Sequence, residues 1–319
     1  MNLEQRFNEI KEKQEETWVR PENDPQYEIS DEEFAEYCKV RRDTVELYNN
    51  IDSEKLEEEI SPSGNFVLRI FPLSTKPGCW NYSLGIIKSV NDNKVIAEIK
   101  RNYSFSHSWA MKDGDEYLIT AEDYQGLTVV NCTQGWMKSW IPRCAVKGRG
   151  FCFARAEISP NGKYLLINGC YWGHQYELRI YDFSTPEQLP YKCLAYVADE
   201  CLDSYFNLSG KWTDNSYILT VKVDEIAHKK LAKDIHSTKK YSQKDSSTTW
   251  EEFTAQTENE FKSLNCDQLK VYQEAADKEN RTMYELGIEE LCDYLQDNLN
   301  TDHWSFFAET NEIKIIYKL

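Results

Sequence analysis

The stretch that decides the fold runs from residue 159 to residue 183 and reads Ser159-Pro-Asn-Gly-Lys-Tyr-Leu-Leu-Ile-Asn-Gly-Cys-Tyr-Trp-Gly-His-Gln-Tyr-Glu-Leu-Arg-Ile-Tyr-Asp-Phe183. Its Pro160-Asn161-Gly162 segment favours a tight turn, because proline fixes φ and the next two residues tolerate positive φ. The apolar run 164–167 has the length and β-branching of a buried strand. Residues 176–183 alternate and are expected to return as a second strand, so the stretch predicts a β-hairpin.

The same pattern of a turn followed by a strand recurs along the chain. Ser61-Pro-Ser-Gly-Asn-Phe-Val-Leu matches the start of the first stretch, and weaker copies begin at Lys112 and Trp212. The copies lie roughly 50 residues apart, within the roughly 40–50 residues of a propeller blade. Further strands are expected in pairs joined by short turns, at 84–90 and 95–100, and at 127–132 and 136–141.

The motif Ser-Pro-x-Gly before an apolar strand, followed by a strand that ends in Arg179-Ile180-Tyr181-Asp182, resembles the blades of WD40-type β-propellers. Tyr181-Asp182 takes the place of the usual Trp-Asp pair, and the expected Gly-His dipeptides are missing. Residues 170–175 are expected to lengthen the hairpin loop. Segments 102–109, 122–126 and 169–172 are also similar to a propeller-like family with no assigned activity. The resemblance covers 61–224 and implies about four antiparallel blades. Four is the lower limit for a closed ring, so a closed ring and an incomplete or open one are both left as alternatives.

The composition divides the chain into four regions. They are an acidic helical extension at 1–58, a propeller-like β domain at 59–224, a basic segment with a helical insertion at 225–300, and a closing β-hairpin at 301–319.

Helices are expected at both sides of the β region. The capping box Ser30-Asp31-Glu32-Glu33 predicts a helix that runs to about residue 48, and we expect residues 1–55 to be dispensable for folding of the β region. Residues 54–59 are interpreted as a solvated helix or linker. Six lysines at 228–244 predict a mobile basic segment. Helical periodicity covers 250–264 and 266–298.

The net charge and the cysteine content restrict which classes of partner and which cellular compartment are expected. The net charge is −17, and residues 1–60 hold 19 acidic against 8 basic side chains. Such a balance argues against nucleic acid and against anionic membranes. Ten cysteines at irregular spacing, with no Cys-x-x-Cys pair, fit neither a secreted disulfide framework nor a thiolate zinc site. With no apolar signal segment and no membrane-spanning run, the expected location is intracellular and cytoplasmic.

Catalytic motifs are absent from the sequence, which contains no nucleophile elbow, zinc-protease motif or Walker loop. Residues 147–151 could form an anion-binding nest, although a connection between blades is the simpler interpretation. His107 is expected to be a hydrogen-bonded structural imidazole. Glu122-Asp123 is expected to contain a turn-capping carboxylate rather than an acid–base pair.

Aromatic residues are numerous near the blade loops, and they are the one feature of the composition that suggests a function. Tyrosine and tryptophan anchor interfaces because they bury a large area at a low entropic cost. The first hypothesis is therefore a non-enzymatic module that binds an unidentified protein partner through its blade loops, without a cofactor or metal. The expected binding residues are Tyr124, Tyr171, Trp172 and His174. Two alternatives stay open: the rings pack between blades, or the site of a hydrolase or other enzyme lies at the blade-loop face around Cys170, His174 and Glu177.

Overall fold

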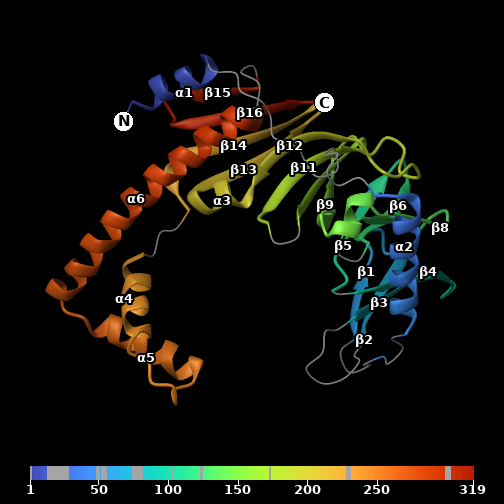
Figure 1. The fold of residues 1–319 in the computed structure, drawn as a ribbon, viewed down its shortest axis with the longest axis horizontal. Helices are drawn as coiled ribbons and strands as arrows, with labels where there is room; N and C mark the ends of the chain where they lie inside the picture. The colour runs from blue at the N-terminus through green and yellow to red at the C-terminus, as the bar shows by residue number, and fades with distance from the viewer. Residues whose placement is uncertain are drawn as a thin grey trace. The chain divides into compact units, whose positions relative to one another are not determined.

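Strands joined by tight turns pair with their neighbours along the chain, because such turns join antiparallel strands. The computed structural model describes residues 2–12, 29–47, 51, 56–73, 82–102, 104–122, 125–171, 174–227, 231–298 and 303–319. In these ranges the strands form four antiparallel sheets of four strands each (Figure 1). The prediction of a mainly β, propeller-like fold with helices at its N-terminal side and in a C-terminal insertion is confirmed.

Three of the sheets are formed by four strands that follow one another in the chain and pair in chain order. The first contains β1 (Glu57–Ile60), β2 (Phe66–Leu73), β3 (Tyr82–Ser89) and β4 (Val95–Arg101). The second contains β5 (His107–Lys112), β6 (Asp115–Ala121), β7 (Leu127–Asn131) and β8 (Trp136–Trp140). The third contains β9 (Phe151–Ile158), β10 (Tyr164–Tyr171), β11 (Tyr176–Asp182) and β12 (Cys193–Asp199).

The fourth sheet is interrupted by the helical insertion. Its order is β13-β14-β16-β15, with β13 at Phe206–Thr213, β14 at Ser216–Ile226, β15 at Trp304–Phe307 and β16 at Glu312–Lys318. Between β14 and β15 lie three helices, α4 (Leu231–Tyr241), α5 (Trp250–Ser263) and α6 (Cys266–Asn298). The remaining helices are α1 (Leu3–Glu12), α2 (Asp31–Glu46), the 3-10 helix η4 (Arg143–Lys147) and α3 (Glu200–Tyr205). The closing hairpin thus completes the sheet that β13 and β14 begin.

The chain divides into two compact units, which are described separately here. Unit 1 comprises Met1–Thr17, Glu200–Lys211 and Ile218–Ile316, and unit 2 comprises Trp18–Asp199, Trp212–Tyr217 and Tyr317–Leu319. Unit 2 therefore holds the first three sheets, and unit 1 holds the helical insertion with most of the fourth. The four regions expected from composition stay a prediction. None of the helices in the described ranges is long and apolar enough to cross a lipid bilayer.

The core of unit 2 lies between successive sheets. One buried cluster joins the first sheet to the second and includes Leu68, Ile87 and Leu118. Another joins the second sheet to the third and includes Val129 and Leu165. Burial of such side chains stabilises the fold by about 25 cal/mol for each Å² of apolar surface removed from water. Face-to-face packing of consecutive four-stranded sheets is the arrangement of propeller blades.

All four turn signals of the sequence fall between the first and second strands of their sheets, and two of the turns also bind residues beyond their own sheet. The carboxylate of Glu116 in β6, which is 1% exposed, accepts hydrogen bonds from the Ser61 hydroxyl (2.9 Å) and the Ser63 amide (3.0 Å). Likewise, the Asn161 side chain donates to the carbonyl oxygen of Asp214 (2.7 Å). A buried carboxylate needs such donors, so the turn at Ser61–Ser63 ties the first sheet to the second.

Gly64 and Gly162 were expected to have positive φ, and this is confirmed by values of 76° and 69°. We expect Gly162→Val to lower the free energy of unfolding by about 1–3 kcal/mol, because a β-branched residue avoids this conformation. Denaturant unfolding measures the change. Gly162→Asn is the matched control, since asparagine tolerates left-handed backbone better than valine. An unchanged midpoint in Gly162→Val would show that the turn imposes no constraint.

Two segments differ from the sequence-based expectation. Residues 57–60 form the edge strand β1 instead of a helix or linker, with Glu58 bound to Arg69 (2.6 Å) and Glu59 bound to His107 (2.6 Å). Its side chains are all exposed, so no apolar alternation marks it, and charges on an edge strand discourage aggregation. Residues 231–241, expected to be a mobile basic segment, form α4, which buries His236. The expectation that His107 is a hydrogen-bonded structural imidazole is confirmed.

The N-terminal helices are attached to the rest of their units. The capping box at Ser30 is formed as predicted, and α2 binds η4 through an Asp31–Arg143 ion pair of 2.8 Å. In unit 1, α1 lies beside β15 (Figure 1), and its Phe7 side chain is 1% exposed. Helix α1 is therefore a packed part of unit 1, and the expectation that residues 1–55 are dispensable for folding of the β region stays a prediction.

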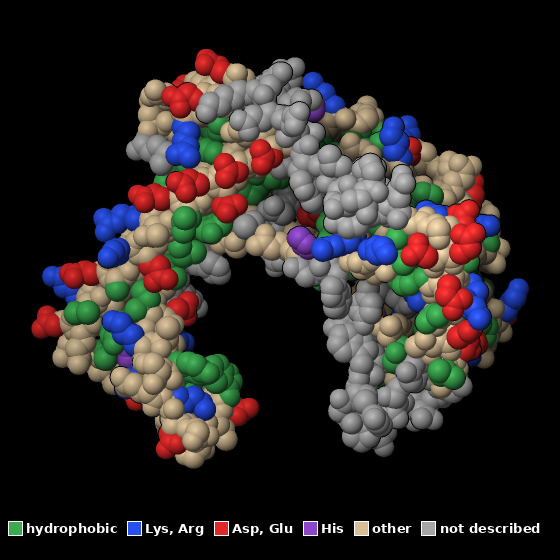
Figure 2. Space-filling model, in the orientation of Figure 1, with side chains coloured by type: hydrophobic (Ala, Val, Ile, Leu, Met, Phe, Trp, Pro, Cys, Tyr) green, Lys and Arg blue, Asp and Glu red, His purple; other side chains and the backbone are tan. Residues whose placement is uncertain are grey.

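The helical insertion contains exposed aromatic side chains and one buried histidine. In the space-filling view, hydrophobic side chains gather at one end of α5, and acidic side chains follow the visible face of α6 (Figure 2). Trp250 and Tyr241 are 62% and 57% exposed. His236, in contrast, is 2% exposed, and neither of its ring nitrogens has a hydrogen-bond partner among the described residues. Its ring lies between those of Phe261 and Tyr272, at centroid distances of 5.5 and 5.0 Å.

Burial holds the pKa of His236 below its usual value of 6.5; Lys240 and Lys239 act in the same direction, and Glu260 opposes them. The folded state therefore prefers the neutral ring. We expect stability to be complete above about pH 6.5 and to decrease as the pH falls through the lowered pKa of the folded state. Thermal unfolding followed by helical circular dichroism between about pH 8 and pH 5 measures this. His236→Phe should remove part of the decrease, and equal pH profiles of both proteins would contradict the prediction.

Candidate functional site

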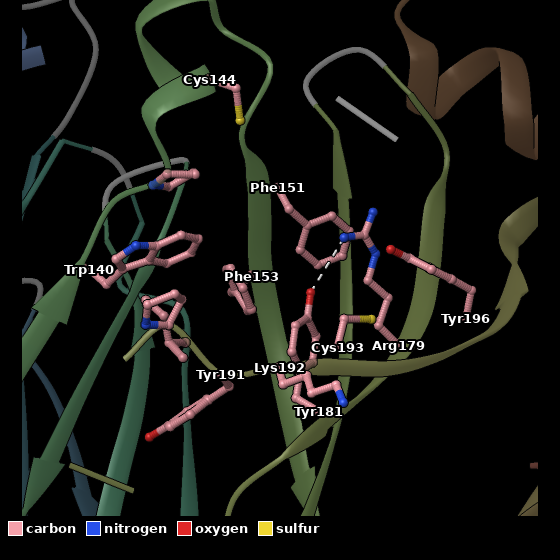
Figure 3. Close-up of a pocket in the computed structure, with 13 residues that line it drawn as sticks. Trp140, Cys144, Phe151, Phe153, Arg179, Tyr181, Tyr191, Lys192, Cys193 and Tyr196 are labelled. Carbon is pink, nitrogen blue, oxygen red and sulfur yellow. Dashed lines mark hydrogen bonds between the residues drawn. The ribbon is translucent and has the colours of Figure 1, made fainter. Parts of the chain in front are cut away.

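A pocket of about 370 Å³ opens in unit 2 between the second and third sheets (Figure 3). Its walls are largely aromatic, and they also contain two prolines, Pro142 and Pro190. The rings belong to Trp140, Phe151, Phe153, Tyr181, Tyr191 and Tyr196. A concave apolar site with a few polar groups is the usual form of a ligand pocket.

The floor of the pocket is formed by side chains of strands β9 and β11, and the alternation of side chains along a strand explains their positions. Alternate residues of a strand face the same side of a sheet. Phe151 and Phe153 therefore lie side by side on β9, with their rings edge to face at 5.2 Å. Arg179 and Tyr181 lie on the same side of β11, where the pairing with β12 shifts in register twice. Such irregularities re-aim side chains near functional sites.

Gly169 makes the packing of this floor possible. A Cβ atom at this position would lie 2.2 Å from the carbonyl oxygen of Cys152 and 2.6 Å from the ring of Phe151. Glycine inside a strand often marks such a close approach of backbone or ring. Residues 170–175 were expected to form a lengthened loop, and this expectation is wrong. Strand β10 continues to Tyr171, and Cys170 pairs with Tyr176 of β11.

The side chain of Arg179 forms the polar end of the pocket although it is 1% exposed. Its guanidinium lies 3.7 Å from the centroid of the Phe151 ring and 4.9 Å from that of Tyr196. The Nε atom donates to the carboxylate of Glu177 (2.9 Å), and Nη1 donates to the hydroxyl of Tyr181 (3.4 Å; Figure 3). A buried charge is stable only with a partner of this kind.

The opposite wall comes from the end of β8 and the segment before β12. Trp140 and Pro142 lead into η4, and Tyr191 and Lys192 precede β12. The Tyr191 hydroxyl donates to the carbonyl oxygen of Pro186 (2.6 Å), and its ring meets Phe183 edge to face at 5.3 Å. Burial raises the pKa of the Tyr191 hydroxyl. Tyr191 is thus held in place, and its ring is available to a ligand.

The segment at 147–151 does not form the anion-binding nest considered above. The amide of Gly148 donates to Ala145 O (2.9 Å), that of Arg149 to Cys144 O (3.0 Å), and that of Gly150 to the Gln125 side chain (2.6 Å). Because these three donors are already used, no cradle of amides is left for an anion. The segment connects the second and third sheets, which was the simpler interpretation.

The four residues expected to bind a partner lie in different surroundings. Tyr124 and Trp172 fall outside the described residues. Tyr171 is 5% exposed and packs in the core, with its ring 5.6 Å from that of Phe151. His174 is exposed, its amide donates to Tyr171 O (2.8 Å), and its ring meets the edge of Tyr171. Whether these residues bind a partner stays a prediction.

The alternative constellation of Cys170, His174 and Glu177 has little geometric support. Glu177 is bound to Arg179, and Cys170 pairs across the strands with Cys152. Hydrogen bonding to Cys170, together with burial, raises the pKa of the Cys152 thiol. The hydrolase hypothesis is therefore not favoured.

Other polar clusters of the described residues are occupied by their own partners. A groove of about 500 Å³ borders α2, β4 and β8. In it, Glu122 binds Arg101 (3.1 Å) and Arg41 (3.4 Å) and accepts from Thr128 (2.5 Å), so this carboxylate serves in an ion-pair network. Asp123, its expected turn-capping neighbour, lies outside the described residues. No group of three histidine, cysteine or acidic side chains in the described ranges could hold a metal ion.

The sequence contained one sign of the pocket that the sequence analysis missed. Arg179 stands between the apolar residues Leu178 and Ile180 in the middle of an expected strand, and a charge that is buried in such a position must be paired or functional. No comparable feature of the sequence marks the other lining residues Trp140, Tyr191 and Lys192. They come from segments that approach β9 and β11 only in the folded chain.

The four blade-like sheets and the pocket between two of them define a β-propeller-type protein. The chain belongs to the same family as "Uncharacterized protein R762" of Acanthamoeba polyphaga mimivirus. The two are 33% identical over 184 residues, which cover 56% of this chain and 71% of the relative. A search of family models found no match. Membership of the WD40 class in particular stays a prediction.

Two solved structures show a distant likeness. TolB from Acinetobacter baumannii has a TM-score of 0.28 and 14% sequence identity over 52% of this chain and 40% of that one. Prolyl oligopeptidase B from Galerina marginata, bound to a 35mer hydrolysis and macrocyclization substrate, has a TM-score of 0.32 and 13% identity. The likeness covers 54% of this chain and 23% of that structure. The fold assignment here rests on the four sheets themselves.

Proposed function

We propose that the protein is a non-enzymatic interaction module that binds a partner protein at the blade loops, with the aromatic pocket as the anchor point. The observation that carries the proposal is the pocket between the second and third sheets, whose walls combine six rings with two prolines. Interface hot spots are such desolvated pockets, which receive a side chain of the partner. The lining contains cations and hydroxyls but no carboxylate or imidazole that would serve as a general base.

The blade loops expected from the sequence take part in this proposal in two ways. His174, exposed at the β10–β11 hairpin, would contact the partner directly. Tyr171 would contribute indirectly. Its ring lies 4.8 Å from the Arg179 guanidinium and supports that side chain, which forms part of the pocket wall. Tyr124 and Trp172 keep the role of expected contacts. A cytoplasmic location and the lack of a cofactor also stay predictions.

The test compares two tryptophan variants in partner capture followed by mass spectrometry. Trp140→Ala removes a pocket wall, and Trp250→Ala removes a tryptophan that is 62% exposed on the helical insertion. For a purified partner, Trp140→Ala should weaken binding by about tenfold or more, the usual effect of losing a hot-spot ring. Trp250→Ala should bind like the wild type, and the melting temperature of each variant serves as the folding control. Equal partner binding by wild type and a folded Trp140→Ala protein would contradict the proposal.

A further inference from the structure

We infer that the pocket selects an aromatic side chain flanked by carboxylates, as found in an acidic segment of a partner protein. The inference rests on the proposed function and names the chemistry of its ligand. It depends on two properties of the lining: the way in which the tyrosine hydroxyls are used, and the sign of the charges.

The lining presents rings whose polar ends are already bound. Tyr191 donates its hydroxyl to Pro186 O, and the Tyr181 hydroxyl accepts from Arg179. The ligand therefore meets mainly ring surface, and Figure 3 shows Trp140, Phe153 and Tyr191 on one side of the space and Tyr196 on the other. Aromatic pairs gain about 0.5–1.5 kcal/mol beyond the area that they bury. An aromatic side chain thus fits this space better than an aliphatic one.

The charges of the lining are of one sign. Arg179 and Lys192 line the pocket, and no aspartate or glutamate does. Glu177 neutralises Arg179, but the Lys192 ammonium is exposed and forms no ion pair within the described ranges. In the neighbouring helix η4, Arg143 pairs with Asp31 (2.8 Å) and Lys147 with Glu33 (3.9 Å), so these two cations are already compensated. Lys192 is therefore the cation of the lining that a charged ligand would meet.

The same charges exclude the usual ligands of aromatic cages. Rings that surround a space commonly bind ammonium groups through their π-faces. Here the faces of Phe151 and Tyr196 are already occupied by the Arg179 guanidinium, and Lys192 would repel a second cation. Carboxylates beside the ligand ring would instead be attracted to Lys192. Complementary charge of this kind sets specificity and the association rate more than the total affinity.

The experiment uses three labelled peptides of equal length, in which one phenylalanine stands between pairs of aspartates, serines or lysines. Fluorescence anisotropy with the full chain should give the tightest binding for the acidic peptide, about tenfold tighter than the serine peptide at low salt and less at high salt. The lysine peptide should bind most weakly. Phenylacetate tests whether a free aromatic acid is sufficient: as tight a complex as the acidic peptide forms would overturn the assignment to a protein segment.

Two charge-reversal variants complete the design. Lys192→Glu should abolish the preference for the acidic peptide, whereas Lys163→Glu, at an exposed position of the same sheet outside the pocket, should leave it unchanged. Equal binding of all three peptides, or none by any, would refute the inference about the ligand. The proposed function fails separately, if the purified partner binds Trp140→Ala as tightly as the wild type.

Discussion

Replacement of Arg179 by methionine is expected to lower the free energy of unfolding by about 3–5 kcal/mol, because it leaves the Glu177 carboxylate, whose side chain is only 12% exposed, without its partner. Arg179 is 1% exposed, and Glu177 binds it through two guanidinium nitrogens. The substitution also removes the cation from the face of Phe151, where the two groups are 3.7 Å apart. Denaturant unfolding, followed by the fluorescence of Trp140 and other tryptophans, measures the loss.

The control for this prediction is the double variant Arg179→Met with Glu177→Met. Removing both charges replaces the ion pair with apolar side chains of similar length, a change that is often neutral or even stabilising. We therefore expect the double variant to recover most of the stability lost in Arg179→Met, and the cycle to show strong coupling between the two sites. A double variant that is no more stable than Arg179→Met would show that the stacking of the guanidinium on Phe151, not the ion pair, holds this region together.

The blades could be predicted because their signals are local. Ser159-Pro160-Asn161-Gly162 specifies a turn by the conformational limits of its own residues, and the apolar run behind it specifies a buried strand. The observed strands β10 and β16 cover the expected segments, and α6 has the expected bounds. Strand β1 could not be predicted in this way, because its four side chains are all exposed and the sequence shows no alternation of apolar and polar residues there.

The pocket could not be predicted because its residues are combined by tertiary packing. Trp140 and Tyr191 are 51 positions apart in the sequence, and neither lies in a motif. Gly169 directly precedes the residues 170–175 that were expected to be a loop, yet it lies inside strand β10, where the ring of Phe151 occupies the space of a Cβ atom. A glycine in the sequence is thus compatible with a loop or with a strand that is closely approached by another side chain, and only the position of Phe151 on the adjacent strand distinguishes the two.

The second large effect is expected in unit 1, where Phe7→Ala should destabilise the contact of α1 with the closing hairpin by about 3–5 kcal/mol, as other truncations of buried phenylalanine do. The Phe7 ring lies 5.2 Å from Phe306 and 6.0 Å from Trp304, edge to face in the latter case. Lys11 adds a hydrogen bond to Trp304 O of 3.1 Å. Helix α1 is short, so its order depends on this packing rather than on its own helical propensity.

Hydrogen exchange at the amides of Ile313 and Ile315, buried residues of β16 in the fourth sheet, provides the measurement. Exchange should accelerate by roughly a hundredfold or more, since each 1.4 kcal/mol is a factor of ten. Gln5→Ala, on the exposed side of the same helix, is the matched control and should leave exchange nearly unchanged. If Phe7→Ala exchanged like Gln5→Ala, α1 would be an appendage after all, because a core contact cannot be removed without opening the strands that it covers.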